Sequence, residues 1–385
     1  MAVKFMVPRT TYIGNGALAD AKDDICKLGK KALIVTGQSM IKQGHMAALT
    51  DMLEDNGIEY VIDSKISGEP TDVMISEGAK MYTDNNCDFL IGFGGGSHLD
   101  SAKAIGVLVT GGVENISDYN GKFITKPIPP LVAIPSTAGT GSEVTKFTAI
   151  ADTRNQIKML LKGDVLIPVI AIVDSQFTMN APKSVTAATG LDALTHAVEA
   201  YTSRLATPQT DLYAISAIKK IFKYLPKAYM DGKDIEAREA MSVAAYEAGI
   251  CINNSSVTLV HGMSRPIGAL FHVPHGISNA MLLKSCLSYA LSGAYERFAI
   301  LGRETGVASH IDSDETAAHK FLDGISDICR ICEIPTLEEY GINKDEFLGC
   351  ADKMAQDAID SGSPSNTRRN ITKENIINIY NQLWE

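Results

Sequence analysis

The first half of the chain alternates short apolar runs with segments of helical periodicity, and this pattern stops near residue 180. Residues 31–37, 88–96 and 129–137 are apolar enough to form buried parallel strands, and 60–66 is a further strand candidate. The segments between these runs carry apolar residues at helical spacing. Such strand–helix alternation is typical of βαβ units, so we expect a doubly wound, mostly parallel sheet.

The second half differs from the first in composition and in the periodicity of its apolar residues. From Pro182 onward it consists of helical stretches rich in Ala, Leu and Ile, joined by connections that contain Pro or Gly. A chain of 385 residues is also too long for one compact core. We therefore expect an α/β domain over residues 1–182 and an all-helical domain over 183–385. The apolar run 165–173 is far too short to span a membrane and is expected to be a buried strand.

Four polar side chains in the second half form a candidate metal site. Asp192 and His196 are four residues apart in a helical segment, so both point from one helix face. His261 and His275 follow, 14 residues apart. A lone histidine is usually a hydrogen-bonded core residue, but a buried carboxylate needs a partner. Three imidazoles and one carboxylate suit Fe(II) or Zn(II), whereas calcium prefers oxygen ligands.

A glycine-rich loop in the first half predicts a phosphate-binding site. Glycines after an apolar strand let backbone amides approach a diphosphate, and the following helix N-terminus favours negative charge. Asp100 lies three residues after Ser97, a spacing that resembles a capping box and would fix the start of this helix. Counted from Gly92 the loop reads G-x-G-x-x-S, which lacks the third glycine of the usual dinucleotide fingerprint. A second stretch of small residues, 135–142, follows the next strand, and the two loops together fit a nucleotide.

Charge and cysteine content exclude several functions. The net charge of −10 argues against binding to nucleic acid or to an anionic membrane surface. The first residues, MAVKFMVPRT, lack the apolar core of a signal peptide, and seven scattered cysteines indicate free thiols in a reducing cytoplasm. Cys329 and Cys332 form a CxxC at helical spacing with neighbouring apolar residues, which favours core packing over a metal or redox site.

Four motifs resemble one family. GGGSHLDSAKAIG, PSTAGTGSEVT, TGLDALTHAVEAY and HGMSRPIGALFHVPHG occur in the order found in the iron-containing (group III) alcohol dehydrogenases, and the similarity spans essentially the whole chain. The resemblance implies a nucleotide-binding α/β domain, a helical domain and a cleft between them. It implies metal ligands at Asp192, His196, His261 and His275. It implies cofactor contacts at Gly94, Gly95, Gly96, Ser97, Asp100, Thr137, Thr140 and Lys158.

The resemblance also implies an activity. The chain would be a metal-dependent alcohol dehydrogenase or aldehyde reductase that transfers a hydride between a nicotinamide dinucleotide and a short-chain alcohol or aldehyde. Fe(II) is the family's usual ion, and Zn(II) would substitute because the same ligands bind it more tightly. Self-association to a homodimer or a larger homo-oligomer is expected, with residues 4–18 as a strand that could pair with a neighbour's edge.

Two positions depart from familiar members of that family. Many relatives carry a second histidine four residues after the first in the H-x-x-x-H stretch; here that position is Arg265, in the first of two candidate turns, 265–268 and 273–276. Arg265 either pairs with a protein group or faces the substrate and binds an anionic group such as a sulfonate or carboxylate. The first strand ends at Gly37 and Ser39 without the aspartate that repels a 2′-phosphate. Gly37 should leave room there, so we expect NAD(H), with NADP(H) as an alternative.

Other possible functions agree less well with the sequence. A metal- and NAD-dependent lyase resembling dehydroquinate synthase would share the two-domain build, but it typically uses a Glu/His/His metal set and recycles its cofactor. A short-chain dehydrogenase would need a helical Tyr-x-x-x-Lys; Tyr229 and Lys233 have that spacing, but a turn is expected between them. A serine hydrolase would need a G-x-S-x-G elbow, and the sequence has none. A non-catalytic nucleotide-binding protein would not need the metal ligands.

Overall fold

The computed structural model describes residues 2–384 and divides into two compact units, Met1–Ala181 and Pro182–Glu385. The division lies one residue before the boundary expected from the sequence. Within residues 2–384, no helix combines the length and the apolar character needed to cross a membrane.

The first unit is built on a six-stranded sheet in which every neighbouring pair of strands is parallel. From one edge to the other the strands are β1 (Thr10–Ile13), β8 (Ile170–Val173), β5 (Leu131–Pro135), β4 (Phe89–Gly94), β2 (Lys31–Thr36) and β3 (Glu59–Asp63). The inner strands are apolar on both faces because helices cover the sheet on both sides.

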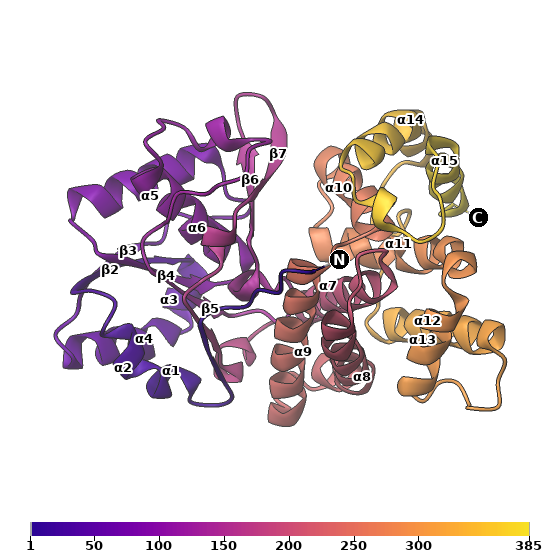
Figure 1. Ribbon diagram of the computed structural model, residues 1–385, viewed down its shortest axis with the longest axis horizontal. Coiled ribbons are helices and arrows are strands. Elements are labelled where there is room, and N and C mark those ends of the chain that lie inside the picture. The colour runs from indigo at the N-terminus through magenta and orange to yellow at the C-terminus, as the bar shows by residue number, and fades with distance from the viewer. Residues whose placement is uncertain (1, 385) are drawn as a thin grey trace. The chain divides into compact units, whose positions relative to one another are not determined.

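Alternate side chains of the inner strands enter two separate cores. Figure 1 shows helices on both sides of this sheet. Ile34 packs on one face beneath α1 (Ala17–Asp20), α2 (Lys22–Ile25) and α4 (His45–Asp55). Leu33 packs on the other face beneath α5 (Asp72–Asp84) and α6 (Gly96–Gly111). This two-sided cover confirms the doubly wound architecture.

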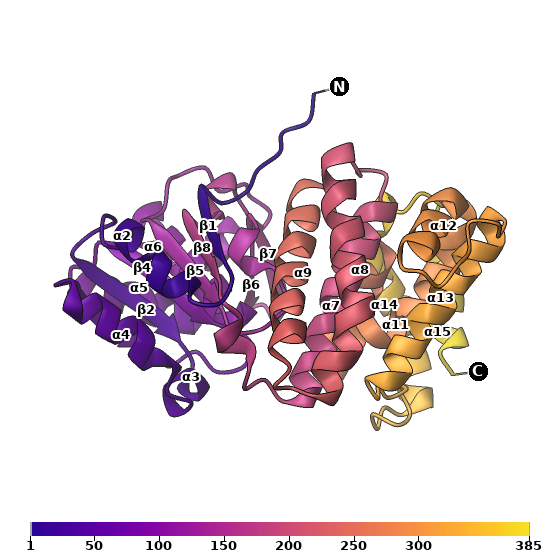
Figure 2. The same ribbon diagram turned by 90° about the horizontal axis from the view of Figure 1, so that it is seen from below.

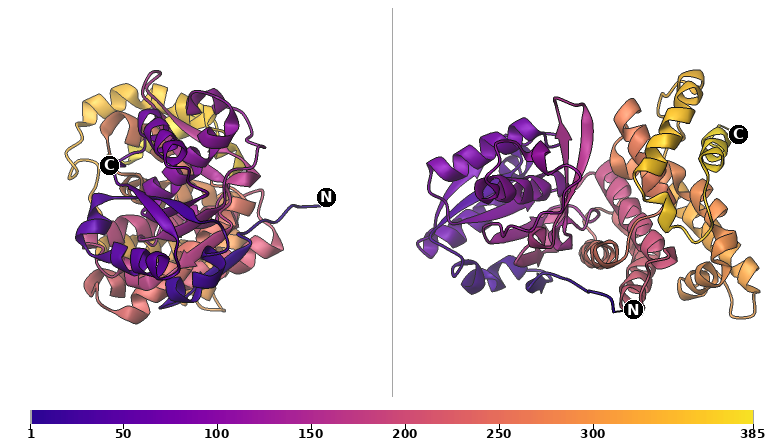
Figure 3. Two further views of the ribbon diagram at one scale, coloured as in Figure 1. Left: turned by 90° about the vertical axis from the view of Figure 1, so that its left-hand side faces the viewer. Right: turned by 45° about the horizontal axis from the view of Figure 1, so that its top comes forward.

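Some local predictions about the first unit were wrong or incomplete. Only the last four residues of the run 165–173 form a strand, because Asp164–Leu166 is a 3-10 turn and Pro168 precedes the strand. The sequence also gave no warning of the antiparallel hairpin β6 (Phe147–Asp152) and β7 (Ile157–Lys162). Figure 3 shows the hairpin standing outside the main sheet, in magenta.

The second unit contains only helices and short turns within its described residues, as expected. The helices are α7 (Lys183–Thr202), α8 (Pro208–Met230), α9 (Ile235–Asn254), α10 (Leu259–Phe271), α11 (His275–Ala290), α12 (Tyr295–Glu304), α13 (Asp314–Ile331), α14 (Lys344–Asp360) and α15 (Lys373–Gln382). Helix α7 packs against α8, α9 and α11 (Figure 2). Every residue of α7 from Gly190 to Thr202 is buried, so its polar side chains must find partners inside the protein.

Three features of this unit test expectations from the sequence. The prediction of a turn at 265–268 was wrong, because these residues lie inside helix α10, which accommodates Pro266. The chain does break at 272–274, where His272 adopts a left-handed conformation (φ 54°). Helix α8 ends at Met230, so Tyr229 and Lys233 do not share a helix. Cys329 and Cys332 lie at the end of α13 as free thiols, and burial raises the pKa of each to about 12.

Candidate metal centre and nucleotide-binding loops

Helix α7 brings Asp192 and His196 to one side of its buried surface. The two side chains are one turn apart, and His196 Nε2 lies 3.7 Å from Asp192 Oδ1. Their side chains are only 4% and 6% exposed, respectively. A carboxylate buried to this extent is costly unless cations or hydrogen-bond donors surround it.

The other two histidines come from α10 and α11. His261 lies in the first turn of α10, and His275 is the first residue of α11, directly after the break at 272–274. This break turns the chain so that both rings face Asp192. His261 Nε2 and His275 Nε2 each lie 3.6 Å from Asp192 Oδ1. The rings of His196 and His261 also stack, with centroids 4.6 Å apart.

These separations fit a shared metal ion better than direct hydrogen bonds. Distances of 3.6–3.7 Å are too long for a hydrogen bond. Ligands at about 2.1 Å from a tetrahedral ion would lie about 3.4 Å from one another. One ligand atom each from Asp192, His261 and His275 lies within 4.8 Å of the other two. The donor set therefore suits a divalent ion such as iron or zinc.

The electrostatics of the cluster also favour a cation. Burial alone would raise the pKa of Asp192, but the facing imidazoles of His196, His275 and His261 lower it below its ordinary range. Burial alone would lower the pKa of His261, yet Glu199 and Asp192 raise it. Two buried carboxylates thus face the same imidazole, and the cluster is stabilised by positive charge.

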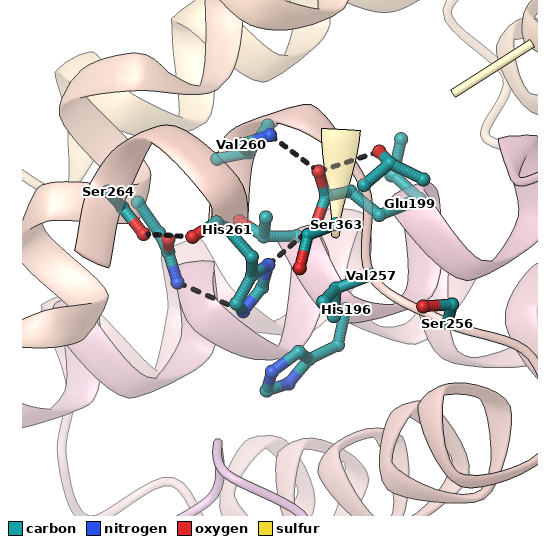
Figure 4. A network of polar contacts seen from close by, with 12 residues as sticks. His196, Glu199, Ser256, Val257, Val260, His261, Ser264 and Ser363 are labelled. Atoms are coloured by element: carbon teal, nitrogen blue, oxygen red, sulfur yellow. Dashed lines mark hydrogen bonds and ion pairs between the residues drawn. The ribbon is translucent and has the colours of Figure 1, made fainter. Parts of the chain in front are cut away.

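Glu199 is a component that the sequence reasoning missed. It lies on α7, is fully buried, and its Oε2 is 2.6 Å from His261 Nδ1 (Figure 4). The sequence did contain a signal for this residue, because residues 192, 196 and 199 of DALTHAVE share one helix face.

Asn279, one turn after His275 on α11, was also missed. Its Nδ2 donates to Asp192 Oδ1 at 2.8 Å and lies 3.2 Å from Nε2 of both His261 and His275. An electropositive amide hydrogen-bond donor therefore points toward the atoms that would bind an ion. The sequence signal for Asn279 was its spacing of four residues from His275 in PHGISN, which places both on one helix face.

In the first unit, two loops of small residues meet at the carboxyl ends of neighbouring strands. Gly94 ends β4 opposite Pro135 of β5, and Ser136 N donates to Gly94 O at 2.9 Å. Gly94 has φ 154°, a conformation that favours glycine. A Cβ at Gly96 would lie 2.8 Å from Thr140 Cγ2, so that threonine packs directly on the glycine.

The other predicted residues of this loop region occupy distinct places. Thr137 packs against Gly95, where a Cβ would lie 3.5 Å from Thr137 Cγ2. Ser97 lies in the first turn of α6 and is partly buried. Lys158 lies on β7 and pairs with Glu69.

Asp100 does not cap helix α6, so that prediction was wrong. The N-cap is Gly95, and no side chain caps the helix. The carboxylate of Asp100 instead accepts hydrogen bonds from Ser142 Oγ at 2.6 Å and Ala149 N at 2.9 Å. Burial raises the pKa of Asp100 despite the nearby charges of Lys103 and Lys158. In this position Asp100 connects α6 to the second loop and to the β6–β7 hairpin.

The expected space beside Gly37 is not there. A Cβ at Gly37 would lie 2.5 Å from His98 Nε2, because the His98 ring fills the position next to the end of β2. The ring also excludes a Cβ at Gly94, which would lie 2.6 Å from His98 Nδ1. Ser39 lies in the short helix α3 (Gln38–Lys42) that follows. The reasoning from Gly37 failed because it considered only neighbours in sequence.

Comparison with known proteins identifies the family of the chain. The model of the iron-containing alcohol dehydrogenase family matches residues 8–175, and the model of that family's C-terminal part matches 186–384. The chain belongs to the iron-containing alcohol dehydrogenase family. It is accordingly a metal-dependent oxidoreductase of the alcohol dehydrogenase type, and neither family model supports the lyase alternative.

Three relatives illustrate the range of the family. The NAD-dependent methanol dehydrogenase of Bacillus methanolicus is 36% identical over 363 residues, covering 94% of this chain and 95% of that protein. The crystal structure of a 1,3-propanediol oxidoreductase is 32% identical, covers 100% of both chains and has a TM-score of 0.95. The sulfoacetaldehyde reductase of Bifidobacterium kashiwanohense, solved with NAD⁺, is 26% identical, covers 100% of this chain and 99% of its own, and has a TM-score of 0.88.

Arg265 is the residue for which the sequence left two interpretations, a protein partner or an anionic substrate. It lies one turn after His261 on α10 and is partly buried. Its Nη1 donates to Ser363 Oγ at 3.0 Å. Among residues 2–384 no carboxylate forms an ion pair with it; burial lowers the pKa of Arg265, and Glu199 raises it. This guanidinium therefore lacks a close counter-ion of its own.

Proposed function

We propose that the chain transfers a hydride between NAD(H) and a short-chain alcohol or aldehyde that carries an anionic group such as a sulfonate or carboxylate. Family membership supports the reaction class. The substrate preference depends on one observation, the partly buried Arg265 whose hydrogen-bond partner is the neutral Ser363.

We propose Asp192, His196, His261 and His275 as the ligands of one divalent ion, Fe(II) or Zn(II) in its place. When bound, the ion supplies Lewis-acid polarisation of the C–O bond that is oxidised or reduced. These four side chains would hold that charge in place; Asp192, His196 and His261 are buried and shield it from water, whereas the His275 side chain is 41% exposed. The glycines of 94–96 let backbone amides approach the cofactor's diphosphate.

Arg265 is suited to hold an anionic substrate because of where it lies. A residue one turn after His261 projects from the same face of α10 as that ligand. A guanidinium is always charged and binds carboxylates or sulfonates through two parallel hydrogen bonds. Such a charge-assisted contact is worth about 1.5–3 kcal/mol, or about one to two orders of magnitude in kcat/KM.

The test is a panel of neutral and anionic aldehydes of equal length. The native protein should prefer the anionic members in kcat/KM, and Arg265→His should abolish that preference. Ser363→Ala is the matched control, because it removes the protein partner of Arg265 but keeps the charge, and it should leave the preference intact. Equal rates for both classes with the native protein would identify a reductase of neutral aldehydes and diols instead.

The metal requirement is tested separately. Chelation should abolish turnover, and Fe(II) or Zn(II) should restore it to unequal extents. His261→Ala should lower the bound metal content in parallel with activity. Full activity in protein shown to be metal-free by elemental analysis would contradict the proposed centre.

We also propose that the chain forms at least a dimer. Strand β1 lies at the edge of its sheet, where its strand partner among the described residues is β8, and edge strands can pair with a strand of another chain. Residues 3, 5 and 7, which precede it, are apolar and exposed. A monomeric mass by light scattering would refute this.

A further inference from the structure

We propose that Glu199 is a positioning residue of the metal centre, which keeps the ring proton of His261 on Nδ1 and so presents the Nε2 lone pair to the ion. This inference rests on the proposed function, in which His261 is a metal ligand. It adds a residue that acts through His261.

Three hydrogen bonds fix the Glu199 carboxylate (Figure 4). Its Oε1 accepts from Thr258 Oγ1 at 2.7 Å and from Val260 N at 2.6 Å. Its Oε2 faces His261 Nδ1 at 2.6 Å. Val260 N is one of the first backbone amides of α10, which have no partner inside the helix. Glu199 therefore anchors the start of α10 to α7 and sets the plane of the His261 ring with the same group.

The neighbours of His261 determine which of its nitrogens carries the proton in the neutral ring. Asn279 Nδ2 donates to the carboxylate oxygen Asp192 Oδ1 at 2.8 Å. That nitrogen also lies 3.2 Å from Nε2 of both His261 and His275, so a donor faces Nε2 of each ring and favours a lone pair there. The remaining proton belongs on Nδ1, where Glu199 accepts it.

A carboxylate in this position has a known effect on a metal site. A histidine ligand that donates its second ring nitrogen to a carboxylate is held in one tautomer and one orientation and becomes a more basic ligand. Loss of such a partner typically lowers metal affinity by about 10–100-fold. Glu199 is well placed for this role because its burial and its two other hydrogen bonds keep it from turning away.

Glu199→Gln is the most direct perturbation. The amide retains the shape of the carboxylate and still accepts from Val260 through its oxygen. Its NH₂ group would then face His261 Nδ1 and donate to it, which moves the ring proton to Nε2, the nitrogen that must bind the ion. We expect the dissociation constant for Zn(II), measured on the full metal-free chain by competition with a chromophoric chelator, to rise about 10–100-fold.

Glu247→Gln is the matched control. Glu247 lies on α9, its side chain is 13% exposed, and it accepts from Ser216 Oγ and Lys220 Nζ, each at 2.9 Å. The control loses a partly buried, hydrogen-bonded carboxylate that does not contact a histidine, so Zn(II) affinity should stay within about twofold of the native value. An equal loss in both variants would overturn the proposal in favour of a general structural effect.

Two further measurements keep the outcome decisive if Glu199→Gln does not fold. The ring ¹⁵N signals of the native metal-free protein, with all histidines labelled, should show His261 protonated at Nδ1 in its neutral form; the Nε2 tautomer would overturn the inference. Thr258→Val retains the contact between Glu199 and His261 and should keep Zn(II) affinity within about threefold. Absence of Zn(II) binding by the native chain would instead refute the proposed metal centre, whereas native binding with unchanged affinity in Glu199→Gln refutes only the role of Glu199.

Discussion

Gly96 separates the two loops of the proposed nucleotide site, and its replacement by alanine gives a sharp test of how they pack. A Cβ at this position would lie 2.8 Å from Thr140 Cγ2, 3.0 Å from Thr140 Oγ1 and 3.2 Å from Thr140 Cβ. The first of these is closer than real Cβ contacts allow. Either Thr140 must change rotamer or the loop 135–142 must move away from α6.

The size of the effect follows from two opposing terms. Overpacking a tight contact costs about 1–3 kcal/mol. Alanine in place of glycine at the start of α6 recovers about 0.5–1 kcal/mol of chain entropy. The net loss lies between about 0 and 2.5 kcal/mol with a central value of about 1 kcal/mol, which for a domain of this size lowers Tm by about 2–4 °C.

Gly95→Ala is the control for this prediction, because its Cβ would meet Thr137 Cγ2 at an ordinary 3.5 Å. In thermal unfolding monitored by fluorescence, Gly96→Ala should lose stability while Gly95→Ala stays within about 1 °C of the native protein. Thr140→Ala in the Gly96→Ala background should restore part of the loss by removing the two closest atoms. Equal Tm values for the two single variants would refute the packing argument.

Two other predictions follow from buried groups of the first unit. Gly37→Asp should lower Tm and weaken turnover with NADH and NADPH alike, because its Cβ would lie 2.5 Å from His98 Nε2; combining it with His98→Ala should restore stability, and a selective loss of NADPH turnover in the single variant would contradict this. Burial raises the pKa of Glu143 to about 7 from its ordinary 4.5, so the native state holds a proton that the unfolded chain releases. The stability that Glu143 contributes is therefore present below about pH 4.5 and is lost as pH rises through about 7. Denaturant unfolding at several pH values should show this loss in the native protein relative to Glu143→Gln, and parallel pH profiles would contradict it.

The fold was predictable wherever the signal is local. Runs such as 31–36 and 89–94 are buried on both faces because the sheet is covered on both sides, and such strands appear in the sequence as continuous apolar runs. The hairpin β6–β7 was not predictable in the same way. Its strands expose one face, and their pattern is no stronger than that of the loops around them.

The candidate metal site shows the same division. The sequence by itself determined the residue types and the spacing of Asp192 and His196, because four residues along a helix always share a face. It also determined the family, since the motifs that carry it are contiguous stretches. The sequence reasoning did not extract Glu199, although it lies on that same face.

Only the tertiary structure decided which distant groups meet. Glu199 and His261 are 62 residues apart in the sequence, and Asn279 and Asp192 are 87 residues apart. His98 fills the space beside Gly37, and Arg265 lies in a helix rather than a turn. Each of these contacts depends on how whole helices and strands pack against one another. That packing is set by many weak contacts summed over each unit, and no short stretch of sequence records the sum.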